Sequence, residues 1–193
     1  MQKTSPSRTK SRRRKLTLAA SLLGASALLG LGACASAVQN RNPMGEMFPA
    51  VIGKSLEGQE VRLPLGEPSV LLLGYVQDAQ FDADRWLVGL LQIAPDVRIF
   101  EVPTLVGFFP FLFEDTIDGG MRSGIPEEDW KSVVTIYGDD ADKVLDFTGN
   151  EKPRNMRVLL LDSDGKVEWF HDRGFSAGRL LELDKAISNL NGA

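Results

Sequence analysis

The sequence predicts an α/β domain in which a central mixed sheet of about five strands is flanked by helices. Three observations support this prediction. An apolar strand, an amphipathic helix and a second strand follow one another closely near the start of the domain. Further strands and helices alternate along the chain, and the C-terminal part has the pattern of a hairpin followed by a helix.

The rest of the domain is organised around Pro68–Trp86. Val70–Val76 is an apolar run typical of a strand buried on both faces, and a polar turn follows at Gln77–Gln80. A helix is expected to begin near Asp82. Its apolar face would contain Trp86, Leu87, Leu90, Leu91 and Ala94. Many α/β folds place their chemistry at such a turn, because it lies at the carboxyl end of a strand.

The other elements follow from local patterns of apolar and turn residues. Before Pro68 we expect a reversal at Glu57–Gly58 and then a short edge strand that ends near Pro64. After the first helix we expect strands at Val97–Val102 (ended by Pro103) and Ser132–Tyr137, a helix at Asp139–Phe147, and a hairpin of Arg157–Leu161 with Lys166–Phe170. Ser176 is expected to cap a last helix. That helix would bury Leu180, Leu183, Ile187 and Leu190.

The first 33 residues have the pattern of a leader that is removed. A basic start, Lys3–Lys15, contains no acidic residue and precedes the apolar segment Leu16–Leu31. Leu31-Gly32-Ala33-Cys34 then resembles a bacterial lipobox. We therefore expect a lipoprotein signal peptide at 1–33, a flexible tether at 34–46 and the folded domain at 47–193. The alternative is an ordinary cleaved signal peptide followed by an incidental cysteine.

The lipobox resemblance implies a location in the bacterial cell envelope. Acyl chains such as palmitate on Cys34 would anchor the protein to a membrane, facing outward from the cytoplasm on the periplasmic side. Ala35 is not the aspartate that retains some lipoproteins in the inner membrane, so the outer membrane is favoured in a bacterium with two membranes. Ser11-Arg12-Arg13 resembles a twin-arginine signal, whereas Lys15 stands where that signal prefers an apolar residue. Both export routes stay open.

The net charge of the chain limits the classes of partner that it can bind. All 26 acidic residues but only 15 of the 22 basic ones follow Cys34, which leaves that part with a net charge of −11. An acidic domain without a basic cluster in its sequence is a poor match to nucleic acid, and its own charge would not attract it to anionic lipid. Membrane attachment is therefore assigned to the anchor.

The element order resembles the thioredoxin-like fold. Leu56-x-Gly58 and Val61-x-Leu63-Pro64 before the core strand, and the segment 159–169 (LLLDSDGKVEW), are similar to peroxiredoxin-type members. In redox members the turn after the first core strand carries a reactive cysteine, whose pKa the helix N-terminus lowers. Here the turn has no cysteine, and Met156 stands near the place of the family's usual proline. With Cys34 assigned to the lipobox, thiol oxidoreductase and peroxidase activities are not expected.

Other catalytic and metal-binding patterns are incomplete. His171 is the only histidine, so a metal site would consist almost entirely of carboxylates. His171 with Asp172 could form a base and its orienting acid, but such a pair is more often a solvated hairpin end. Asp162-x-Asp164-Gly165 resembles the opening of a calcium loop without its later glutamate, and is better explained as a turn. We expect no cofactor and no metal.

Two features are candidates for partner binding. Phe108, Phe109, Phe111 and Phe113 surround Pro110, which interrupts a regular helix, so some of these rings would be exposed; core packing is the simpler alternative. Arg122 lies among glycines, which suggests a special backbone conformation that aims its guanidinium at a fixed acceptor. The simpler alternative is a surface turn with an ordinary salt bridge.

Gly120-Met121-Arg122-x-Gly124-Ile125, together with the strand ending at Trp169, resembles the mitochondrial F-type ATP synthase assembly factors of thioredoxin-like fold. The resemblance implies a membrane-associated, non-redox protein that assists the assembly of another protein, with Arg122, Trp169 and the phenylalanines as contact residues. Two alternatives stay open. One is an enzyme of peroxiredoxin-related ancestry that uses carboxylates or His171, and the other is a carrier of a small apolar ligand. The sequence names no partner.

Overall fold

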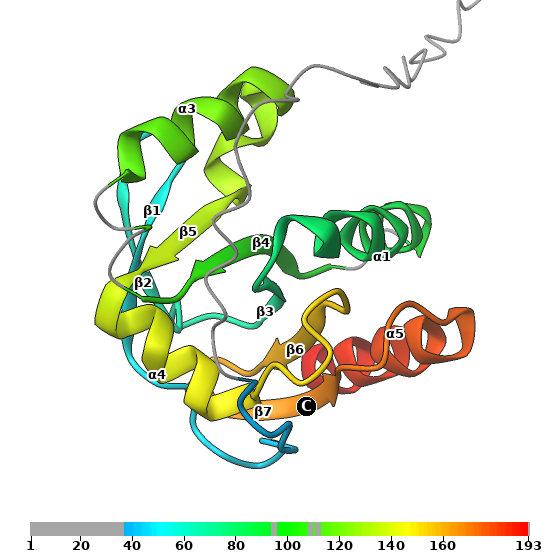
Figure 1. Ribbon diagram of the computed structural model, residues 1–193. Coiled ribbons are helices and arrows are strands. Elements are labelled where there is room, and N and C mark those ends of the chain that lie inside the picture. Colours follow the sequence, from blue (N-terminus) through cyan, green and yellow to red (C-terminus); the bar gives the residue numbers. More distant parts are fainter. Residues whose placement is uncertain (1–36, 94–95, 108–109, 111–112, 193) are drawn as a thin grey trace, which may run out of the picture. The chain divides into compact units, whose positions relative to one another are not determined.

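The computed structural model describes residues 37–93, 96–107, 110 and 113–192, which form a mixed sheet with helices on both faces (Figure 1). The strands are β1 (Val51–Ser55), β2 (Glu60–Leu63), β3 (Ser69–Gly74), β4 (Arg98–Leu105), β5 (Val134–Tyr137), β6 (Arg157–Leu161) and β7 (Val167–His171). The helices are α1 (Gln80–Ile93), α3 (Glu114–Gly124), α4 (Gly138–Thr148) and α5 (Ala177–Asn191), with short 3-10 helices η1 (Gln77–Ala79) and η2 (Glu127–Ser132).

The described strands follow the order β2-β1-β5-β4-β3-β6-β7. The three central strands β5, β4 and β3 are parallel, and all other neighbours pair antiparallel. The predicted mixed sheet flanked by helices is thus confirmed, although it has seven strands rather than about five. Six of the described strands coincide with segments expected from the sequence, and the exception is β1. It approaches β5 so closely that a Cβ on Gly53 would lie 2.5 Å from a Val134 methyl carbon, and a glycine and a lysine in five residues do not mark a strand.

Strand β3 is buried on both faces, as predicted. Leu71 and Leu73 belong to a core that includes α4, whereas Val70 and Leu72 belong to a second core that includes α1 and α5. This alternation is the period of two that strand geometry imposes on successive side chains. The sheet therefore separates two apolar layers, and its parallel strands bring the β3–α1 and β5–α4 connections to the same edge.

Strand β4 extends three residues beyond the predicted end. Pro103 was expected to stop the strand, but it lies opposite Gly74, the last residue of β3, and the strand continues to Leu105. A proline at this point costs little, because β3 ends there and needs no further hydrogen bond from it. In α1, Trp86 and Leu90 are buried as expected. Leu91 is not on that face, since 72% of it is exposed.

The C-terminal hairpin and helix agree with the prediction. Asp162 Oδ1 accepts hydrogen bonds from the backbone N–H groups of Asp164 (2.9 Å) and Lys166 (2.8 Å), which identifies this segment as a turn. Helix α5 buries Leu180, Leu183 and Ile187 and packs Leu190 partly against them. Ser176 stands at the N-cap position but makes no side-chain capping bond, so the predicted cap is wrong.

The described part of the predicted tether is bound to the domain. Val38 N–H donates to Asn150 Oδ1 (2.8 Å), and Asn150 N–H donates to the carbonyl of Val38 (2.9 Å). Asn40 Oδ1 accepts from Glu151 N–H at 2.8 Å, and Gly45 N–H donates to the carbonyl of Val167 at 2.8 Å. The polar residues that suggested a flexible linker serve here as hydrogen-bonding groups. The chain is therefore held against the domain from Val38 onward.

Candidate functional site

The connection from β3 to α1 is the place where redox members of this fold would act. It consists of η1 and its flanking residues and carries no thiol. Tyr75 fixes the connection to α4, because its hydroxyl donates to the carbonyl of Val144 (3.0 Å) and lies 2.7 Å from Thr148 Oγ1. Burial raises the pKa of Tyr75 to about 12, so the hydroxyl stays neutral.

Asp82 joins three segments of the chain next to the connection from β3 to α1. Its Oδ2 accepts from the backbone N–H of Met156 (2.9 Å) and its Oδ1 from the backbone N–H of Phe175 (2.7 Å). The side chain is buried, and the two bonds join α1 to the segments before β6 and α5. Met156, expected near the family's proline position, is thus tied down through its backbone. We define this arrangement of Asp82, Met156 and Phe175 as the closed corner. Its carboxylate is engaged structurally.

Aromatic rings fill the space behind the closed corner. Trp86 is fully buried, with its ring centroid 6.1 Å from that of Trp169, 5.9 Å from that of His171 and 5.3 Å from that of Phe175. Trp169 is only 8% exposed. The structure therefore places Trp169, a candidate for partner contact, in the core, where it does not contribute to a binding surface.

His171 and Asp172 do not form a base and its orienting acid. His171 Nε2 lies 2.9 Å from the carbonyl oxygen of Gly174, while Asp172 Oδ2 accepts from Asn40 Nδ2 at 2.8 Å. Each side chain thus has a separate structural partner. This arrangement removes the support for an enzyme based on His171.

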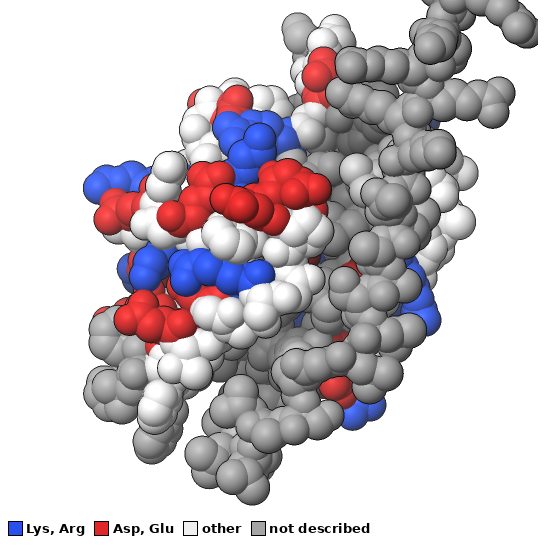
Figure 2. Space-filling view, turned by 90° about the horizontal axis from the view of Figure 1, so that it is seen from above, with Lys and Arg blue, Asp and Glu red and all other residues white. Residues whose placement is uncertain are grey.

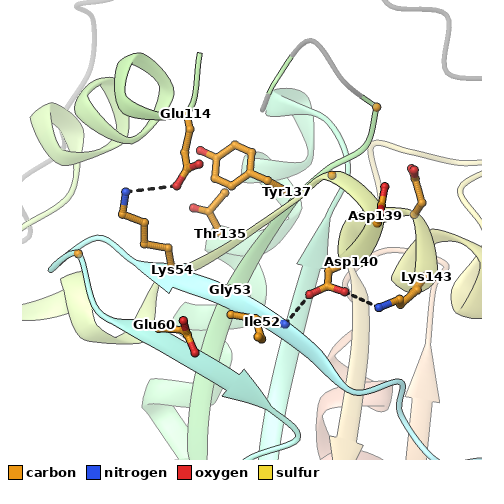
Figure 3. A pocket seen from close by; sticks show the side chains of 14 residues that line it. Ile52, Gly53, Lys54, Glu60, Glu114, Thr135, Tyr137, Asp139, Asp140 and Lys143 are labelled. Carbon is orange, nitrogen blue, oxygen red and sulfur yellow. Dashed lines mark hydrogen bonds and ion pairs between the residues drawn. The ribbon is translucent and has the colours of Figure 1, made fainter. Parts of the chain in front are cut away.

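A cleft of about 850 Å³ lies between β1, β5, α3 and α4 (Figure 3). Five carboxylates line it: Glu60, Glu114, Asp139, Asp140 and Asp142. Lys54 and Lys143 are the basic residues among its described lining. We call it the acidic cleft. Its lining is charged, which disfavours the carrier of a small apolar ligand.

Ion pairs organise both walls of the acidic cleft. Lys54 Nζ lies 3.2 Å from Glu114 Oε1 and 3.8 Å from Asp115 Oδ1, and its hydrogen bond to Glu114 raises the pKa of Lys54. On the other wall Asp140 accepts from Ile52 N–H (2.8 Å) and from Lys143 Nζ (2.6 Å), as Figure 3 shows. Burial favours a higher pKa for Asp140, but these hydrogen bonds outweigh it and lower the pKa.

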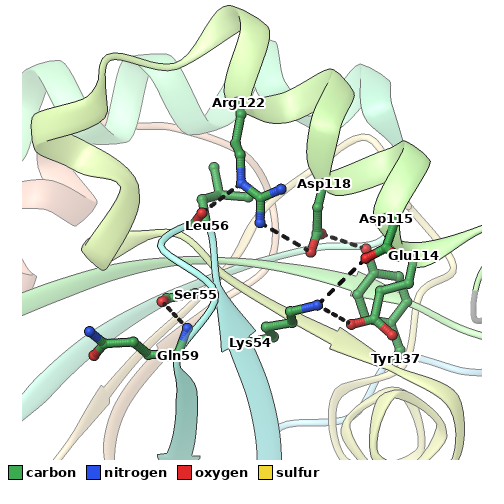
Figure 4. A network of polar contacts seen from close by, with 9 residues as sticks. All are labelled: Lys54, Ser55, Leu56, Gln59, Glu114, Asp115, Asp118, Arg122 and Tyr137. Atoms are coloured by element: carbon green, nitrogen blue, oxygen red, sulfur yellow. Dashed lines mark hydrogen bonds and ion pairs between the residues drawn. The ribbon is translucent and has the colours of Figure 1, made fainter.

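A buried carboxylate supports the base of α3 (Figure 4). Asp118 is fully buried, and Tyr137 Oη donates to its Oδ1 at 2.7 Å. Burial, followed by this contact with a carboxylate, raises the pKa of Tyr137 far above its ordinary value. Asp118 Oδ2 has no hydrogen-bond partner among the described residues, and Arg122 lies 3.9 Å from it. Charge attraction from Arg122 therefore supplements a single strong hydrogen bond.

Arg122 fastens α3 to the turn between β1 and β2. Its Nε donates to the carbonyl of Leu56 at 2.6 Å, and its guanidinium carbon lies 6.0 Å from the ring centroid of Trp130. A fixed backbone acceptor was expected for this guanidinium, and Leu56 supplies it. The expected special backbone is absent, because Gly119, Gly120 and Gly124 lie within a regular helix. Arg122 is therefore paired inside the domain.

The phenylalanine segment is described only in part. Phe113 is 57% exposed and directly precedes Glu114, a residue of the acidic cleft. Phe108, Phe109 and Phe111 lie outside the described residues, as do Cys34 and the signal peptide. Among the described helices, none combines the length and the apolar character needed to cross a membrane.

Sequence reasoning missed most of the cleft. Lys54, Tyr137 and Asp140 come from three segments that meet only through the pairing of β1 with β5. The helix expected at Asp139–Phe147 is present as α4, and its Asp140 accepts a hydrogen bond from the backbone of β1. A run of acidic residues directly after a strand was the available signal. It could not reveal the partner 88 residues away.

The charged side chains of the surface are mixed. Figure 2, which views the molecule from above relative to Figure 1, shows bands of Lys and Arg beside bands of Asp and Glu. Most of the described ion pairs at the surface are partly exposed, such as Arg98 with Glu67 (2.8 Å) and Lys166 with Glu168 (2.7 Å). Exposed pairs of this kind contribute little to stability.

The comparisons with known proteins identify the fold. The sequence matches no protein-family model and no curated protein. Among solved structures, the chain is similar to BsSco, a member of the Sco family of cytochrome c oxidase assembly proteins, with 14% identity over 79% of this chain and 99% of that one (TM-score 0.55).

Two further solved structures are similar to this chain in fold. A putative protein disulfide isomerase from Bacteroides thetaiotaomicron is 13% identical over 81% of this chain and 95% of its own (TM-score 0.54). A SCO1/SenC family lipoprotein from Bacillus anthracis is 12% identical over 79% and 99%, respectively (TM-score 0.53). The domain thus has the predicted thioredoxin-like fold, and the similarity to F-type ATP synthase assembly factors is not found among these neighbours.

Proposed function

We propose that this protein is a lipid-anchored, non-redox thioredoxin-like protein of the bacterial cell envelope that binds a membrane or envelope protein and assists its assembly. The observation that carries the proposal is the closed corner. At the place where redox members need a free thiolate, Asp82 joins three segments of the backbone. The only cysteine in the sequence is Cys34, outside this corner. A domain built in this way acts by binding.

The acidic cleft and its rim provide the surface for a protein partner. Ile52, which lines the cleft, is 44% exposed, and Phe113 beside Glu114 is 57% exposed. Interfaces commonly combine apolar contacts of this kind with charged groups that fix orientation. The lining carries more carboxylates than lysines. A partner segment with basic residues next to an apolar one fits this chemistry.

The membrane anchor and the role in assembly rest on the sequence and on similarity of fold. The lipobox pattern at Leu31–Cys34 supports acylation of Cys34. The names of two structural neighbours point in the same direction: one is a lipoprotein, and the other belongs to a family of cytochrome c oxidase assembly proteins. The relation to F-type ATP synthase assembly remains the finer form of the proposal, with the same requirement for a membrane-protein partner.

Two measurements in the native bacterium test the proposal. Metabolic labelling with radioactive palmitate should label the full chain and leave Cys34→Ser unlabelled. A photo-crosslinking amino acid at Phe113 should give a specific adduct with one envelope protein, and the same amino acid at Leu181, an exposed position of α5, should not. Absence of an adduct at position 113, or equal adducts from both positions, would contradict partner binding by this face. Absence of label would contradict the anchor separately.

A further inference from the structure

A basic hollow lies next to the closed corner, in a domain that is acidic as a whole. Arg85, Arg154 and Arg173 line a depression of about 480 Å³ together with Phe81. All three arginines are exposed, and 74% of Phe81 is exposed. We define these four residues as the basic hollow. The sequence did not reveal it, because its arginines come from α1 and from two loops far along the chain.

Two of the three arginines have no ion-pair partner among the described residues. Arg154 Nε lies 3.1 Å from Asp78 Oδ2. Within the described part of the chain, no ion pair within 4.0 Å involves Arg85 or Arg173. The remaining carboxylate of the lining, Asp82, is already occupied by two backbone N–H groups. The hollow therefore presents positive charge to an anionic surface, with an exposed aromatic ring beside it.

The start of the described chain lies next to this hollow. Asn40 Nδ2 donates to Asp172 Oδ2 at 2.8 Å, and Asn155 Nδ2 donates to the carbonyl of Asp172 at 3.2 Å. Asp172 directly precedes Arg173, and Asn155 directly follows Arg154. The backbone around Val38 is thus fastened within a few residues of two of the arginines.

The remaining length of chain limits how far the anchor can be. Val38 lies four positions after Cys34. A fully extended chain spans about 14 Å over four positions, and about 21 Å over the six positions from Cys34 to Asn40. An acyl group on Cys34 would therefore hold the membrane surface close to this side of the domain. A longer free tether, reaching to residue 46, would have left the orientation open.

We propose that the basic hollow is the surface by which the anchored domain rests on anionic lipid, with the arginines at the headgroups and Phe81 at the interface. This inference rests on the proposed lipid anchor. A net charge of −11 would keep the free domain away from such a membrane. The anchor supplies proximity, and the hollow then selects the face that meets the lipid. An acidic protein segment fits the same charge, but the short reach to Cys34 favours the membrane.

The test uses the full lipidated chain in liposomes. Acylation of Cys34 leaves no other thiol, so single cysteines can be introduced and labelled with an environment-sensitive fluorophore. We would label Phe81→Cys as the reporter and Arg62→Cys, exposed on β2, as its control. With phosphatidylglycerol present, nitroxide-bearing lipids should quench the label at position 81 at least about twofold more than the label at position 62.

Charge-matched variants then test the arginines. In the Phe81→Cys protein, Arg85→Gln with Arg173→Gln should reduce quenching to the level measured on phosphatidylcholine alone. Arg62→Gln with Lys131→Gln changes the net charge equally at exposed positions outside the hollow and should leave quenching unchanged.

Several outcomes would overturn the proposal. One is stronger quenching at position 62 than at position 81, and another is unchanged quenching after the two arginine changes. A third is that the arginine changes abolish binding of an acidic peptide such as hexaglutamate but leave quenching by lipid intact. Palmitate labelling of the same samples separates the two proposals. An unlabelled chain means that the anchor has failed, and a labelled chain with the wrong face toward lipid means that only this inference has failed.

Discussion

The closed corner and the acidic cleft lie at the same edge of the parallel strands but use carboxylates in opposite ways. In the closed corner, both oxygens of Asp82 accept backbone N–H groups and the side chain is buried. In the cleft, Glu114 and Asp140 pair with lysines whose side chains remain partly exposed. A saturated buried carboxylate stabilises a fold, whereas partly exposed pairs can exchange partners. The closed corner is thus structural, and under the proposed function partner binding belongs to the cleft.

The largest effect should come from the closed corner. Asp82→Ala removes the acceptor for one buried and one partly buried backbone N–H group, so we expect the free energy of unfolding to fall by about 3 kcal/mol. The matched control is Asp84→Ala on the same helix, where an exposed carboxylate accepts a hydrogen bond from Gln80 (3.0 Å). We expect that change to cost less than about 0.5 kcal/mol. Urea unfolding measures both, and equal costs would show that Asp82 does not close the corner.

The second effect depends on pH and concerns Tyr137, whose hydroxyl donates a hydrogen bond to the buried Asp118. The pKa of Tyr137 is raised above its ordinary value of 10.0 in the folded protein. Its contribution to stability is therefore complete below pH 10 and is lost as the pH rises, because only the unfolded chain ionises there. The loss is at most about 1.4 kcal/mol per pH unit, and the partial exposure of Tyr137 shortens the pH range over which it accumulates.

Tyr137→Phe isolates this contribution. Tyr75, whose pKa is raised to about 12, stays in both proteins and keeps its own pH dependence. Above pH 10 the variant should therefore lose stability less steeply than the wild type, while at neutral pH it is less stable because Asp118 loses its hydrogen-bond donor. Parallel alkaline slopes in chemical unfolding would contradict the role given to the Tyr137 hydroxyl.

A smaller effect is expected at the contact between α3 and the β1–β2 turn. Arg122→Ala removes the hydrogen bond to the carbonyl of Leu56 and should cost about 1 kcal/mol. Hydrogen exchange should then accelerate in the turn around Gly58. Arg122→Lys retains the charge near Asp118 but loses the planar guanidinium, so it serves as the control for geometry. Unchanged exchange in Arg122→Ala would assign Arg122 to the surface alone.

The smallest effect should come from the exposed ion pair of the cleft. Lys54→Gln removes the contact with Glu114, and the partial exposure of both side chains limits its cost to about 0.5 kcal/mol or less. The difference should shrink further in high salt. A loss as large as that of Asp82→Ala would mean that the cleft, too, is structural.

Local patterns were enough to predict the elements that carry their own signal. The apolar run of β3, the spacing in α5 and the turn at Asp162 each predict the observed structure. Strand β1 was missed because its identity depends on contact with β5, and Gly53 makes sense only in that contact. The part played by Asp82 was missed for the same reason, since its partners are 74 and 93 residues away.

The surfaces were harder to predict than the core. Trp169 was a candidate for partner binding, but its ring packs beside that of Trp86 in the core. The ring stands at an inward-facing position of β7, which is buried whatever residues precede and follow it in the sequence. The basic hollow was invisible, since its three arginines are scattered through an acidic chain. Arginines this far apart in the sequence form one charged surface only when the fold brings their segments together.

Partner binding at the acidic cleft and lipid contact at the basic hollow are tested most directly by a pair of photo-crosslinking experiments in the same cells, with the reactive amino acid at Phe113 or at Phe81. Both rings are exposed, one beside the acidic cleft and one in the basic hollow. We predict a protein adduct from position 113 and lipid adducts from position 81, both lost in Cys34→Ser. A protein adduct from position 81 and none from position 113 would contradict the assignment of partner binding to the cleft.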